Sequence, residues 1–410
     1  MDTTPTVTEG TSSHTRHALV ALAFVALAAE IGYSIVNISA LAPFVRYLHL
    51  EALIGVFLAA FLLSEAILKT PMGAWGDRVG RRRLVVVGLL ISATCQILIA
   101  GTRNSLGIIG VRILDGVGAA MVWPAVFALA SDHSHEDHRT GAMGLINTMY
   151  VAALAVGPML GGALNDLTHS VKASFYLAAG VMVIAALVSG LVLPSSRAHR
   201  ARAAAAGEQA HAGLLRELVV GLKLVPDLVP MALITFAGVG TLAPIVKLFS
   251  MDVLGLTESK FGIIMAVAAV CVAVASMRLG RLADRIGRVR TVRIGVATIA
   301  VCLWVLTWVA AGRAPHGLAS LLMTLLAAVL GLGFVITVPA WLAIVVSRGK
   351  EKRRGAVVGV VGTAQGVGMV FGAAAGGWLY KTHGHYTPFL VSAVLLSLAF
   401  LGVLLIKEHR

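Results

Sequence analysis

The sequence predicts an all-α polytopic membrane protein whose twelve transmembrane helices form two similar halves. Its composition, a series of long apolar runs and an internal repeat each support this fold class. Of the 410 residues, 58% are hydrophobic and only 13% are charged, and the mean hydropathy is +0.90. Since about a quarter of a soluble domain is charged, these charges are too few to cover a soluble surface of this size. A bilayer solvates an apolar exterior without them.

Twelve apolar stretches are each long enough to cross the bilayer. A helix needs about 20 residues to span ~30 Å of hydrocarbon, and the predicted spans are 18–46, 52–72, 84–101, 105–131, 141–164, 172–193, 228–250, 259–279, 293–312, 316–346, 355–380 and 386–406. A polar segment rich in Ala and Arg separates the sixth span from the seventh. The predicted organisation is therefore a tail over 1–17, a six-helix bundle over 18–193, a linker over 194–227, a second bundle over 228–406 and a tail over 407–410.

The basic residues indicate how the chain is oriented. The net charge of +14 is distributed in short clusters between the apolar runs, which favours membrane topology over a nucleic-acid partner. Most of the 33 lysines and arginines fall on the side that holds both termini, and the opposite side has only Arg46, Arg103, Lys172, Lys260, Arg313 and Lys381. Because positively charged loops stay in the cytoplasm, we expect cytoplasmic termini and an integral protein of the cytoplasmic (inner) membrane.

The two halves repeat the same sequence features. Segment 73–81 reads GAWGDRVGR, and segment 280–288 reads GRLADRIGR. The shared positions are Gly73, Asp77, Arg78, Gly80 and Arg81 in the first copy and Gly280, Asp284, Arg285, Gly287 and Arg288 in the second. Glycines in the fourth and fifth spans recur in the tenth and eleventh at a constant displacement, as Gly116 and Gly331 illustrate. A constant displacement across two spans indicates a duplicated six-helix unit.

The GxxxDRxGRR pattern, its copy in the second half and the twelve spans with a central linker resemble the major facilitator superfamily over almost the whole chain. The resemblance implies a secondary transporter rather than an enzyme, with two bundles around a central cavity that opens alternately to either side. A carboxylate such as Asp77 at the end of a span can pair with Arg78 or Arg81, or cap a neighbouring helix. We expect both motif copies to act as a conformational latch between the bundles. The alternative is a basic cluster that only sets topology.

The fourth span carries two charges inside the membrane. Residues 112–120 read RILDGVGAA and resemble the RxxxGxGAA signature of proton-linked facilitators, in which Gln is usual where Asp115 stands. Arg112 and Asp115 are three residues apart, so they share a helix face and can pair. The matching positions of the second half hold Ala327 and Leu330. Charges confined to one half favour a role in proton coupling over a scaffold role, and the alternative is an ion pair that satisfies itself.

The fifth span carries a glycine and proline pattern. Residues 153–162 read ALAVGPMLGG and resemble the GxxxGPxxGG signature of drug and proton antiporters, with Ala153 in the first Gly place. The matching residues are Gly157, Pro158, Gly161 and Gly162. Glycines allow close helix approach, and a proline permits a bend. The alternative explanation for the glycines is that they only allow neighbouring helices to pack closely, without any role in antiport.

Two further acids lie at membrane depth. A carboxylate there tends to be protonated, paired or in contact with water, so each is a candidate proton-coupling site. Glu65 has Lys69 one helical turn further on, and an intrahelical pair is its alternative role. Glu30 has no basic residue three or four positions away. Glu30 is therefore the first choice for the group that carries the proton, and Arg112 could reach it across helices.

Other polar side chains inside the spans are candidates for the substrate cavity: Tyr33, Asn37, Lys69, Asn147, Tyr150, Lys247, Trp341 and Gln365. The alternative for each of them is packing or an interhelical hydrogen bond. The acids of the first two spans also resemble those of glycolipid flippases in the same superfamily. In those proteins a cavity Arg is expected where Tyr33 stands, and this departure weakens the flippase hypothesis.

No metal or cofactor site is expected. The three histidines of the 132–139 loop lack the spacing that places two of them on one helix face. No GxxxxGK[ST] loop for nucleotide phosphates is present, and the three cysteines lie inside apolar segments without metal-ligand spacing. The energy for transport should therefore come from an ion gradient.

The resemblance implies a proton-coupled exporter for multidrug efflux, acting as an antiporter by alternating access on amphipathic or cationic organic compounds. The expected partners are that small substrate, protons and membrane lipid, and we expect a monomer. A proton-coupled lipid or glycolipid flippase is the first alternative. A substrate sensor that has a transporter fold but does not transport is the second.

Overall fold

The computed structural model describes residues 8–132, 139–193, 222–312, 316–348 and 354–405, and this part of the chain is helical without β-strands. The first half contains α1 (Thr8–Ser34), η1 (Ile35–Ala40), α2 (Leu41–Tyr47), η2 (Glu51–Leu53), α3 (Ile54–Val79), α4 (Arg81–Gly101), α5 (Ser105–Asp132), α6 (Arg139–Thr168) and α7 (Ala173–Val192). The second half contains α10 (Leu228–Leu242), α11 (Val246–Asp252), α12 (Glu258–Ile286), α13 (Arg288–Ala310), α14 (His316–Arg348), α15 (Arg354–Thr382) and α16 (Thr387–Leu404).

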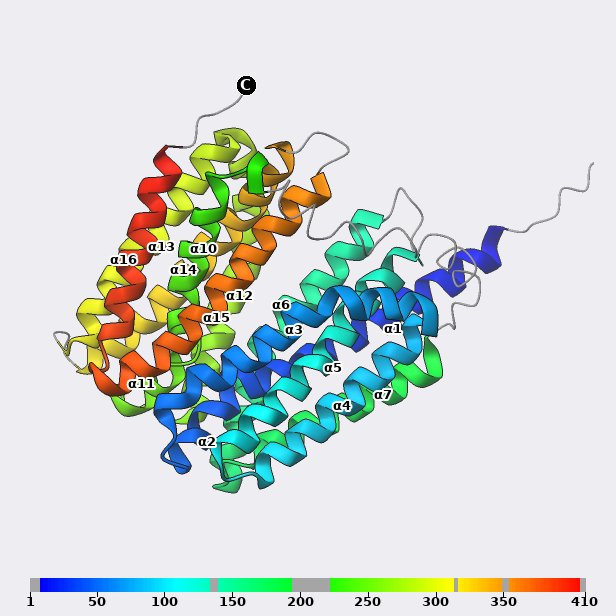
Figure 1. The fold of residues 1–410 in the computed structure, drawn as a ribbon, viewed down its shortest axis with the longest axis horizontal. Helices are drawn as coiled ribbons and strands as arrows, with labels where there is room; N and C mark the ends of the chain where they lie inside the picture. The colour runs from blue at the N-terminus through cyan, green and yellow to red at the C-terminus, as the bar shows by residue number, and fades with distance from the viewer. Residues whose placement is uncertain (1–7, 133–138, 194–221, 313–315, 349–353, 406–410) are drawn as a thin grey trace, which may run out of the picture.

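The helices form two bundles of six membrane-crossing units, one from each half of the chain (Figure 1). Among the described residues, eleven segments are long and apolar enough to cross a membrane, and the 29-residue helix α12 completes the twelve. The predicted fold class is confirmed. Most of the predicted linker over 194–227 and the predicted tail over 407–410 lie outside the described residues. Helix α1 begins at Thr8, ahead of the predicted first span.

Two crossings are interrupted rather than straight. The first crossing passes from α1 through the π-helical segment η1 into α2, and the seventh passes from α10 into α11 through a turn over 243–245. A π-helical turn is wider than an α-helical turn and often occurs at functional sites. Segment η1 contains Asn37 and Ser39, whose contacts are described below.

Glycine permits the tight turn in both copies of the repeated motif. Gly80 separates α3 from α4 with φ 110° and ψ 122°, and Gly287 separates α12 from α13 with φ 96° and ψ 148°. Side chains rarely tolerate this region of backbone space, whereas glycine has no Cβ to clash. We call the end of the molecule with these two turns the motif end. The opposite end, with segments 48–50 and 253–257, is the distal end.

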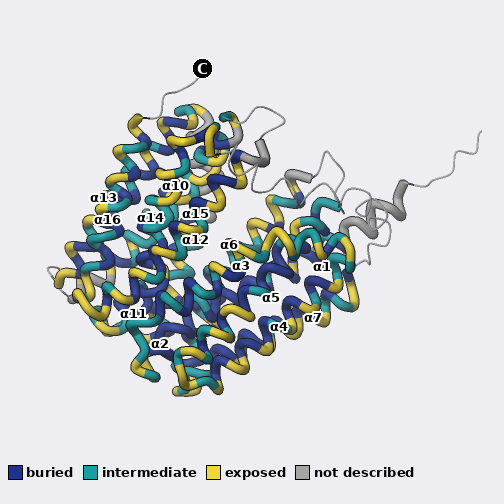
Figure 2. The backbone as a smooth tube through the Cα atoms, in the orientation of Figure 1, coloured by how far each residue is buried: buried dark blue, intermediate teal, exposed yellow. Residues whose placement is uncertain are grey.

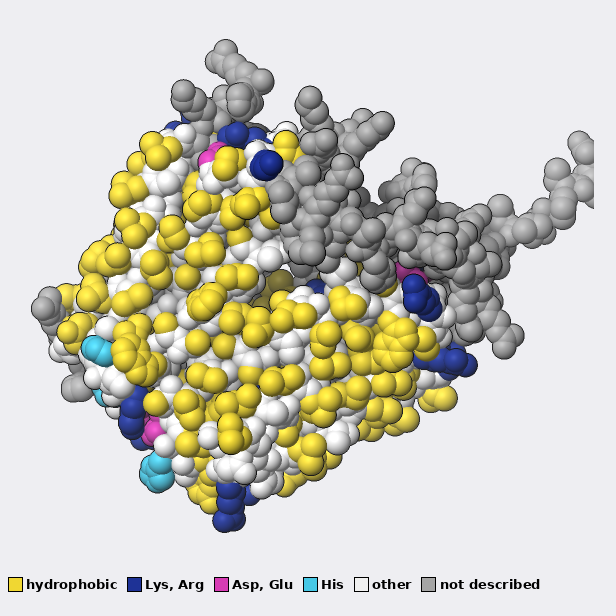
Figure 3. Space-filling view, viewed as in Figure 1, with side chains coloured by type: hydrophobic (Ala, Val, Ile, Leu, Met, Phe, Trp, Pro, Cys, Tyr) yellow, Lys and Arg dark blue, Asp and Glu magenta, His cyan; other side chains and the backbone are white. Residues whose placement is uncertain are grey.

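The exterior is apolar, as expected for a surface that contacts lipid. Hydrophobic side chains cover the face drawn in Figure 3, and large apolar residues such as Leu106, Leu191 and Trp378 are exposed. Buried residues instead line the helix faces that point into each bundle (Figure 2). The hydrophobic effect provides little drive between helices in lipid, so close packing of small residues must stabilise the bundles.

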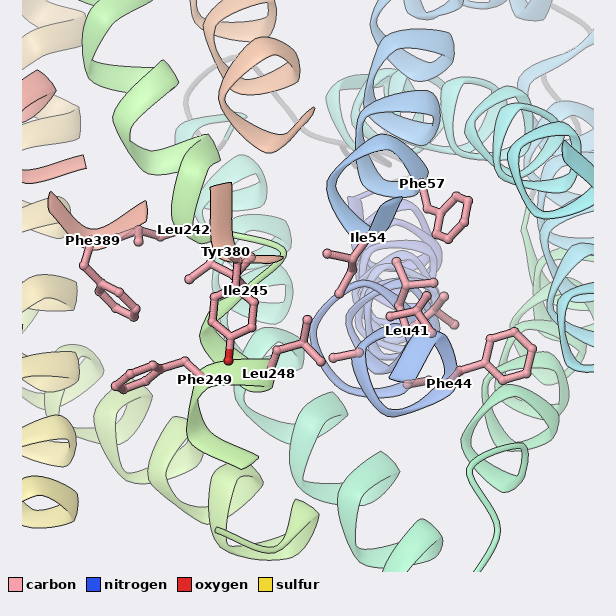
Figure 4. Packing of buried hydrophobic residues seen from close by; sticks show 14 of the residues in the cluster. Leu41, Phe44, Ile54, Phe57, Leu242, Ile245, Leu248, Phe249, Tyr380 and Phe389 are labelled. Atoms are coloured by element: carbon pink, nitrogen blue, oxygen red, sulfur yellow. The ribbon is translucent and has the colours of Figure 1, made fainter. Parts of the chain in front are cut away.

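The two bundles contact each other toward the distal end. Glycines allow their backbones to approach: a Cβ at Gly55 would lie 2.8 Å from the Ala373 carbonyl carbon, and one at Gly262 would lie 2.7 Å from the Pro158 carbonyl oxygen. Apolar residues from both halves, among them Leu41, Ile54 and Leu248, join one buried cluster there (Figure 4). The bundles diverge toward the motif end (Figure 1), and Figure 3 shows a hollow between them. Among the described residues, the two bundles are therefore in contact at the distal end and separated at the motif end.

Candidate functional site

A charged pair is fully buried in the first bundle. Arg112 and Asp115, both on α5, have no exposed surface, and Arg112 Nη1 donates to Asp115 Oδ2 at 2.7 Å. Arg112 also donates from Nη2 to Asn37 Oδ1 and from Nε to the Phe57 carbonyl at 3.3 Å, and its guanidinium lies 4.4 Å from the Phe61 ring centroid. These contacts join α5 to η1 and α3. The predicted Arg112–Asp115 contact is therefore present, together with partners from two other helical segments.

The polar groups around this pair are incompletely satisfied. Asp115 Oδ1 and both polar atoms of Gln96 lack a hydrogen-bond partner of normal geometry, although the two side chains are close enough to interact. The Tyr33 hydroxyl and Ser92 Oγ are 2.9 Å apart, and Ser92 lies beside the Asp115 carbonyl. Buried polar atoms without partners are uncommon and often mark functional sites. Gln96 and Ser92 were not predicted from the sequence, because both resemble ordinary polar residues of an apolar span.

Glu30 lies nearby on α1 and is 5% exposed. Its carboxylate interacts with the Tyr150 hydroxyl of α6 and lies within electrostatic range of Glu65 and Lys69 on α3. Glu65 and Lys69 form an ion pair at 2.8 Å, with side chains 15% and 50% exposed. The intrahelical pair considered for Glu65 is therefore present. A buried acid, a partly buried acid and an exposed ammonium therefore lie within electrostatic range of one another in the first bundle.

The other cavity candidates do not form one group. Asn37 and Tyr150 belong to the clusters just described, while the Tyr33 side chain is buried inside the first bundle. Asn147 is exposed on α6, and Trp341 and Gln365 are half-buried in the second bundle. Lys247 lies elsewhere, at the distal interface.

The first copy of the repeated motif connects three helices of a single bundle. Arg81 donates from Nε to Asp77 Oδ1 at 2.8 Å and forms an ion pair with Asp132 at the end of α5. Arg82 donates to the Leu193 carbonyl beyond α7 at 3.0 Å. In the second copy Arg285 and Arg288 are exposed, and the side chains of 280–284 lie outside the described residues. The cluster thus stabilises the first bundle in this state, and the latch between bundles stays a prediction.

The glycines of the fifth span contact two different neighbours. Gly157 and Gly161 face Ser34, Ile35 and Ser39 of the first crossing, whereas Gly162 faces Glu258 and Ser259 at the start of α12. Ser34 Oγ donates to the Ala153 carbonyl at 3.0 Å. Pro158 lies within α6, where its carbonyl approaches Gly262. The glycine and proline segment of α6 therefore lies between the first crossing and the opposite bundle.

A second buried charged cluster lies at the distal end, between the bundles. Lys247 of α11 forms an ion pair with Glu258 at 2.8 Å, and Lys247 Nζ also donates to the Ser39 carbonyl at 2.5 Å and to Ser39 Oγ at 2.9 Å. Asn165 Nδ2 of α6 donates to the same Glu258 oxygen at 3.0 Å. Lys247 and Glu258 belong to the second bundle, and Ser39 and Asn165 to the first. These four residues are called the distal cluster.

Lys247 was predicted to line the substrate cavity, and the other three members of the distal cluster were not predicted from the sequence. Glu258 stands at a predicted span boundary, where acids are common, and Asn165 resembles a packing residue. The repeat held a signal that could have found Glu258, because it occupies the place that Glu51 has in the first half.

Further polar contacts between the bundles surround the distal cluster. Ser259 N donates to Asp166 Oδ2 at 2.8 Å, Arg46 pairs with Asp252 at 2.9 Å, and Lys381 pairs with Glu51 at 3.6 Å. Each of them joins the two bundles. A cavity of about 520 Å³ opens beside Glu258, lined by Asn165, Asp166, His169, Ser170, Val171 and Thr257 as well as Glu258 itself.

Within the described residues no group of three or more His, Cys, Asp or Glu side chains has the arrangement of a metal site. The histidine-rich loop considered for a metal lies largely outside the described residues, since only Asp132 and Arg139 at its ends are included.

Relatives with curated names include bacterial multidrug resistance proteins. The chain is 27% identical over 395 residues to Multidrug resistance protein 2 of Bacillus subtilis (strain 168), and the match covers 94% of this chain and 95% of that protein. It is 27% identical over 357 residues to Multidrug resistance protein MdtG of Enterobacter lignolyticus (strain SCF1), covering 85% of this chain and 81% of that protein.

Solved structures share the fold at low sequence identity. The nucleoside transporter NupG superposes with a TM-score of 0.77 at 12% identity, covering 94% of this chain and 99% of that chain. A D-xylose-proton symporter gives a TM-score of 0.72 at 16% identity, covering 95% of this chain and 98% of that chain. The family model described as Major Facilitator Superfamily matches residues 22–226 and 228–410. With its twelve helices in two related bundles, this integral membrane protein belongs to the Major Facilitator Superfamily and is a transporter rather than an enzyme.

Proposed function

We propose that this transporter exports amphipathic or cationic organic compounds in exchange for protons by alternating access. The observation that carries the proposal is the position of Glu30, a buried acid that contacts Tyr150 and neighbours Glu65. Intramembrane ionisable groups commonly mark ion or substrate pathways. The multidrug resistance proteins among its relatives support the substrate class.

The charge state of Glu30 and Glu65 decides whether this region can bind a proton or a cationic substrate. Glu65 is neutralised by Lys69, whereas Glu30 has a hydroxyl partner rather than a cationic one. A carboxylate of this kind is neutral when it holds a proton and attracts a cation when it has lost the proton. Exchange follows because the proton and the cationic substrate compete for the same negative charge.

The open motif end is the cytoplasmic side in this proposal, in agreement with the excess of basic residues there. The substrate enters the hollow from that side and displaces the proton from Glu30 into the cytoplasm. The bundles then close at the motif end and open at the distal end. A proton from outside reloads Glu30, and the substrate leaves.

The test is substrate-induced proton movement in liposomes that contain the purified protein. Lipophilic cations and fluorescent lipids are screened in parallel, and the Glu30→Gln variant is compared with wild type. Asp227→Asn is the matched control, because it removes one carboxylate from a pair with Arg348 outside the proposed site. We expect drug-dependent proton flux in wild type and Asp227→Asn, and its loss in Glu30→Gln.

Three outcomes would contradict the proposal in different ways. Full proton-driven transport by Glu30→Gln would remove Glu30 from the coupling step. Translocation of labelled lipid without any response to drugs would favour the flippase. No flux of any substrate by correctly folded protein would favour the sensor.

A further inference from the structure

The distal cluster contains the most deeply buried charges that join the two bundles among the described residues. The side chains of Lys247 and Glu258 are 2% and 9% exposed. Lys247 Nζ donates three hydrogen bonds, two of which go to Ser39 in the opposite bundle, and Glu258 accepts from Asn165 across the same interface. Separation of the bundles at the distal end must break the contacts with Ser39 and Asn165.

The repeat contains a second, matched contact. Glu258 follows Glu51 by the displacement that also relates Gly280 to Gly73. Each acid stands at the distal start of the second crossing of its half. The facing positions match in sequence as well, because Lys381 and Asp166, the neighbour of Asn165, are related by the displacement that links Gly157 to Gly372. Asp166 itself accepts from the Ser259 amide beside Glu258. Two contacts between the bundles are therefore related by the pseudo-twofold axis. One joins Glu51 to Lys381 of α15, and the other joins Glu258 to α6.

The two contacts differ in burial and in number of partners. Glu51 and Lys381 are 3.6 Å apart, and the Lys381 side chain is 55% exposed. Water competes for such a pair, so it stabilises little. Glu258 instead has Lys247, and the corresponding part of the first half, residues 30–45, contains no Lys or Arg. Charge-assisted hydrogen bonds of a buried pair are stronger and cost more to break.

Segment η1 connects the distal cluster to the buried pair in the first bundle. Asn37 accepts from Arg112, and Ser39, two residues further on, accepts from Lys247. Both belong to the same π-helical segment, Ile35–Ala40. A change at Arg112 and Asp115 that moves η1 would therefore alter the acceptors of Lys247 directly.

We propose that the distal cluster is an asymmetric lock that holds the distal end closed, and that η1 transmits the state of the Arg112–Asp115 pair to it. Lys247 and Glu258 are the positioning residues of this lock, and the Glu51–Lys381 contact is its weak counterpart. The proposal rests on alternating access in the proposed function, but it does not require that Glu30 carries the proton or that drugs are the substrate.

The experiment measures distal opening by the distance between two spin labels in the full-length protein in lipid nanodiscs. Cys95, Cys271 and Cys302 are first replaced by Ala, and labels are attached through Arg103→Cys and Ala311→Cys, which are exposed in the distal loops of opposite bundles. Glu258→Gln and its repeat-matched control Glu51→Gln make the same chemical change in each half. Ser39→Ala removes one acceptor of Lys247 while all charges keep their partners.

We expect Glu258→Gln to raise the ratio of distal-open to distal-closed protein roughly tenfold or more, as loss of a charge-assisted hydrogen bond predicts. Glu51→Gln should change the ratio less than about fivefold. Ser39→Ala should shift it in the same direction as Glu258→Gln, by less. Arg112→Met should also broaden the distribution of distances between the two labels, because it removes the hydrogen bond from Arg112 to Asn37 in η1.

Equal responses of Glu258→Gln and Glu51→Gln would overturn the asymmetry. No shift in Glu258→Gln or Ser39→Ala, in protein that elutes as a single folded species, would overturn the lock itself. If the Glu258→Gln protein does not fold, the label distances in Ser39→Ala still test whether the distal cluster holds the distal end closed. An unchanged distribution in Arg112→Met would remove η1 as the connection. A failure of proton coupling at Glu30 would leave these distances unchanged, so the two proposals fail separately.

Discussion

Arg112 and Asp115 illustrate how much a single buried charge depends on its partner. Both side chains are fully buried, and Asp115 Oδ1 already lacks a hydrogen bond. Arg112→Met would leave the Asp115 carboxylate buried without a cation, which should destabilise the protein by about 3–5 kcal/mol. The double variant Arg112→Met, Asp115→Leu removes both charges and should be clearly more stable than the single variant.

The measurement is the free energy of unfolding in mixed detergent micelles for the two variants and wild type. Equal losses in the single and double variants would show that Arg112 acts through packing, for example on Phe61, rather than through charge. Transport by the double variant should be impaired even where stability returns, because the hydrogen bond from Arg112 to Asn37 of η1 is lost.

The connection between α3 and α4 depends on one backbone position. Gly80 has φ 110° and ψ 122°, a region that an L side chain enters at a cost of about 1–3 kcal/mol. Gly80→Ala should therefore lower the free energy of unfolding by that amount. Gly110→Ala is the control, because Gly110 is helical in α5 and a Cβ there meets no atom within 4 Å.

Because alanine is the better helix former, Gly110→Ala should be neutral or stabilising by about 0.5–1 kcal/mol. The two variants are compared by thermal unfolding in detergent. A Gly80→Ala protein as stable as Gly110→Ala would mean that the turn relaxes to another geometry. The recurrence of the same conformation at Gly287 argues against such freedom.

The relative position of the two bundles depends on glycines that let backbones touch. A Cβ at Gly262 would lie 2.6 Å from Met159 Cα and 2.7 Å from the Pro158 carbonyl oxygen. These are backbone atoms and cannot rotate away. Gly262→Val should therefore separate α12 from α6 and favour the distal-open state, seen as longer distances between labels at positions 103 and 311. Gly359→Val, where a Cβ meets nothing within 4 Å, should leave the distances unchanged.

Much of this molecule follows from the sequence alone. A long apolar run has one low-energy form in a bilayer, since a helix satisfies its own backbone hydrogen bonds. The crossings and the two related halves were therefore predictable. So was the Arg112–Asp115 contact, because residues three apart on one helix are neighbours whatever the tertiary structure.

The contacts between helices could not be predicted, because they depend on how each helix is rotated and how far the bundles separate. Sequence spacing placed Lys247 among the cavity residues, whereas the turn between α10 and α11 directs it to Ser39 and Glu258. Arg112 was a candidate partner of Glu30, but Asn37 and Asp115 occupy its guanidinium. The sequence by itself determined the helices and their repeat, since local hydrogen bonding in lipid decides them. Only the tertiary structure decided which buried charges meet, because their partners come from helices far apart in the chain.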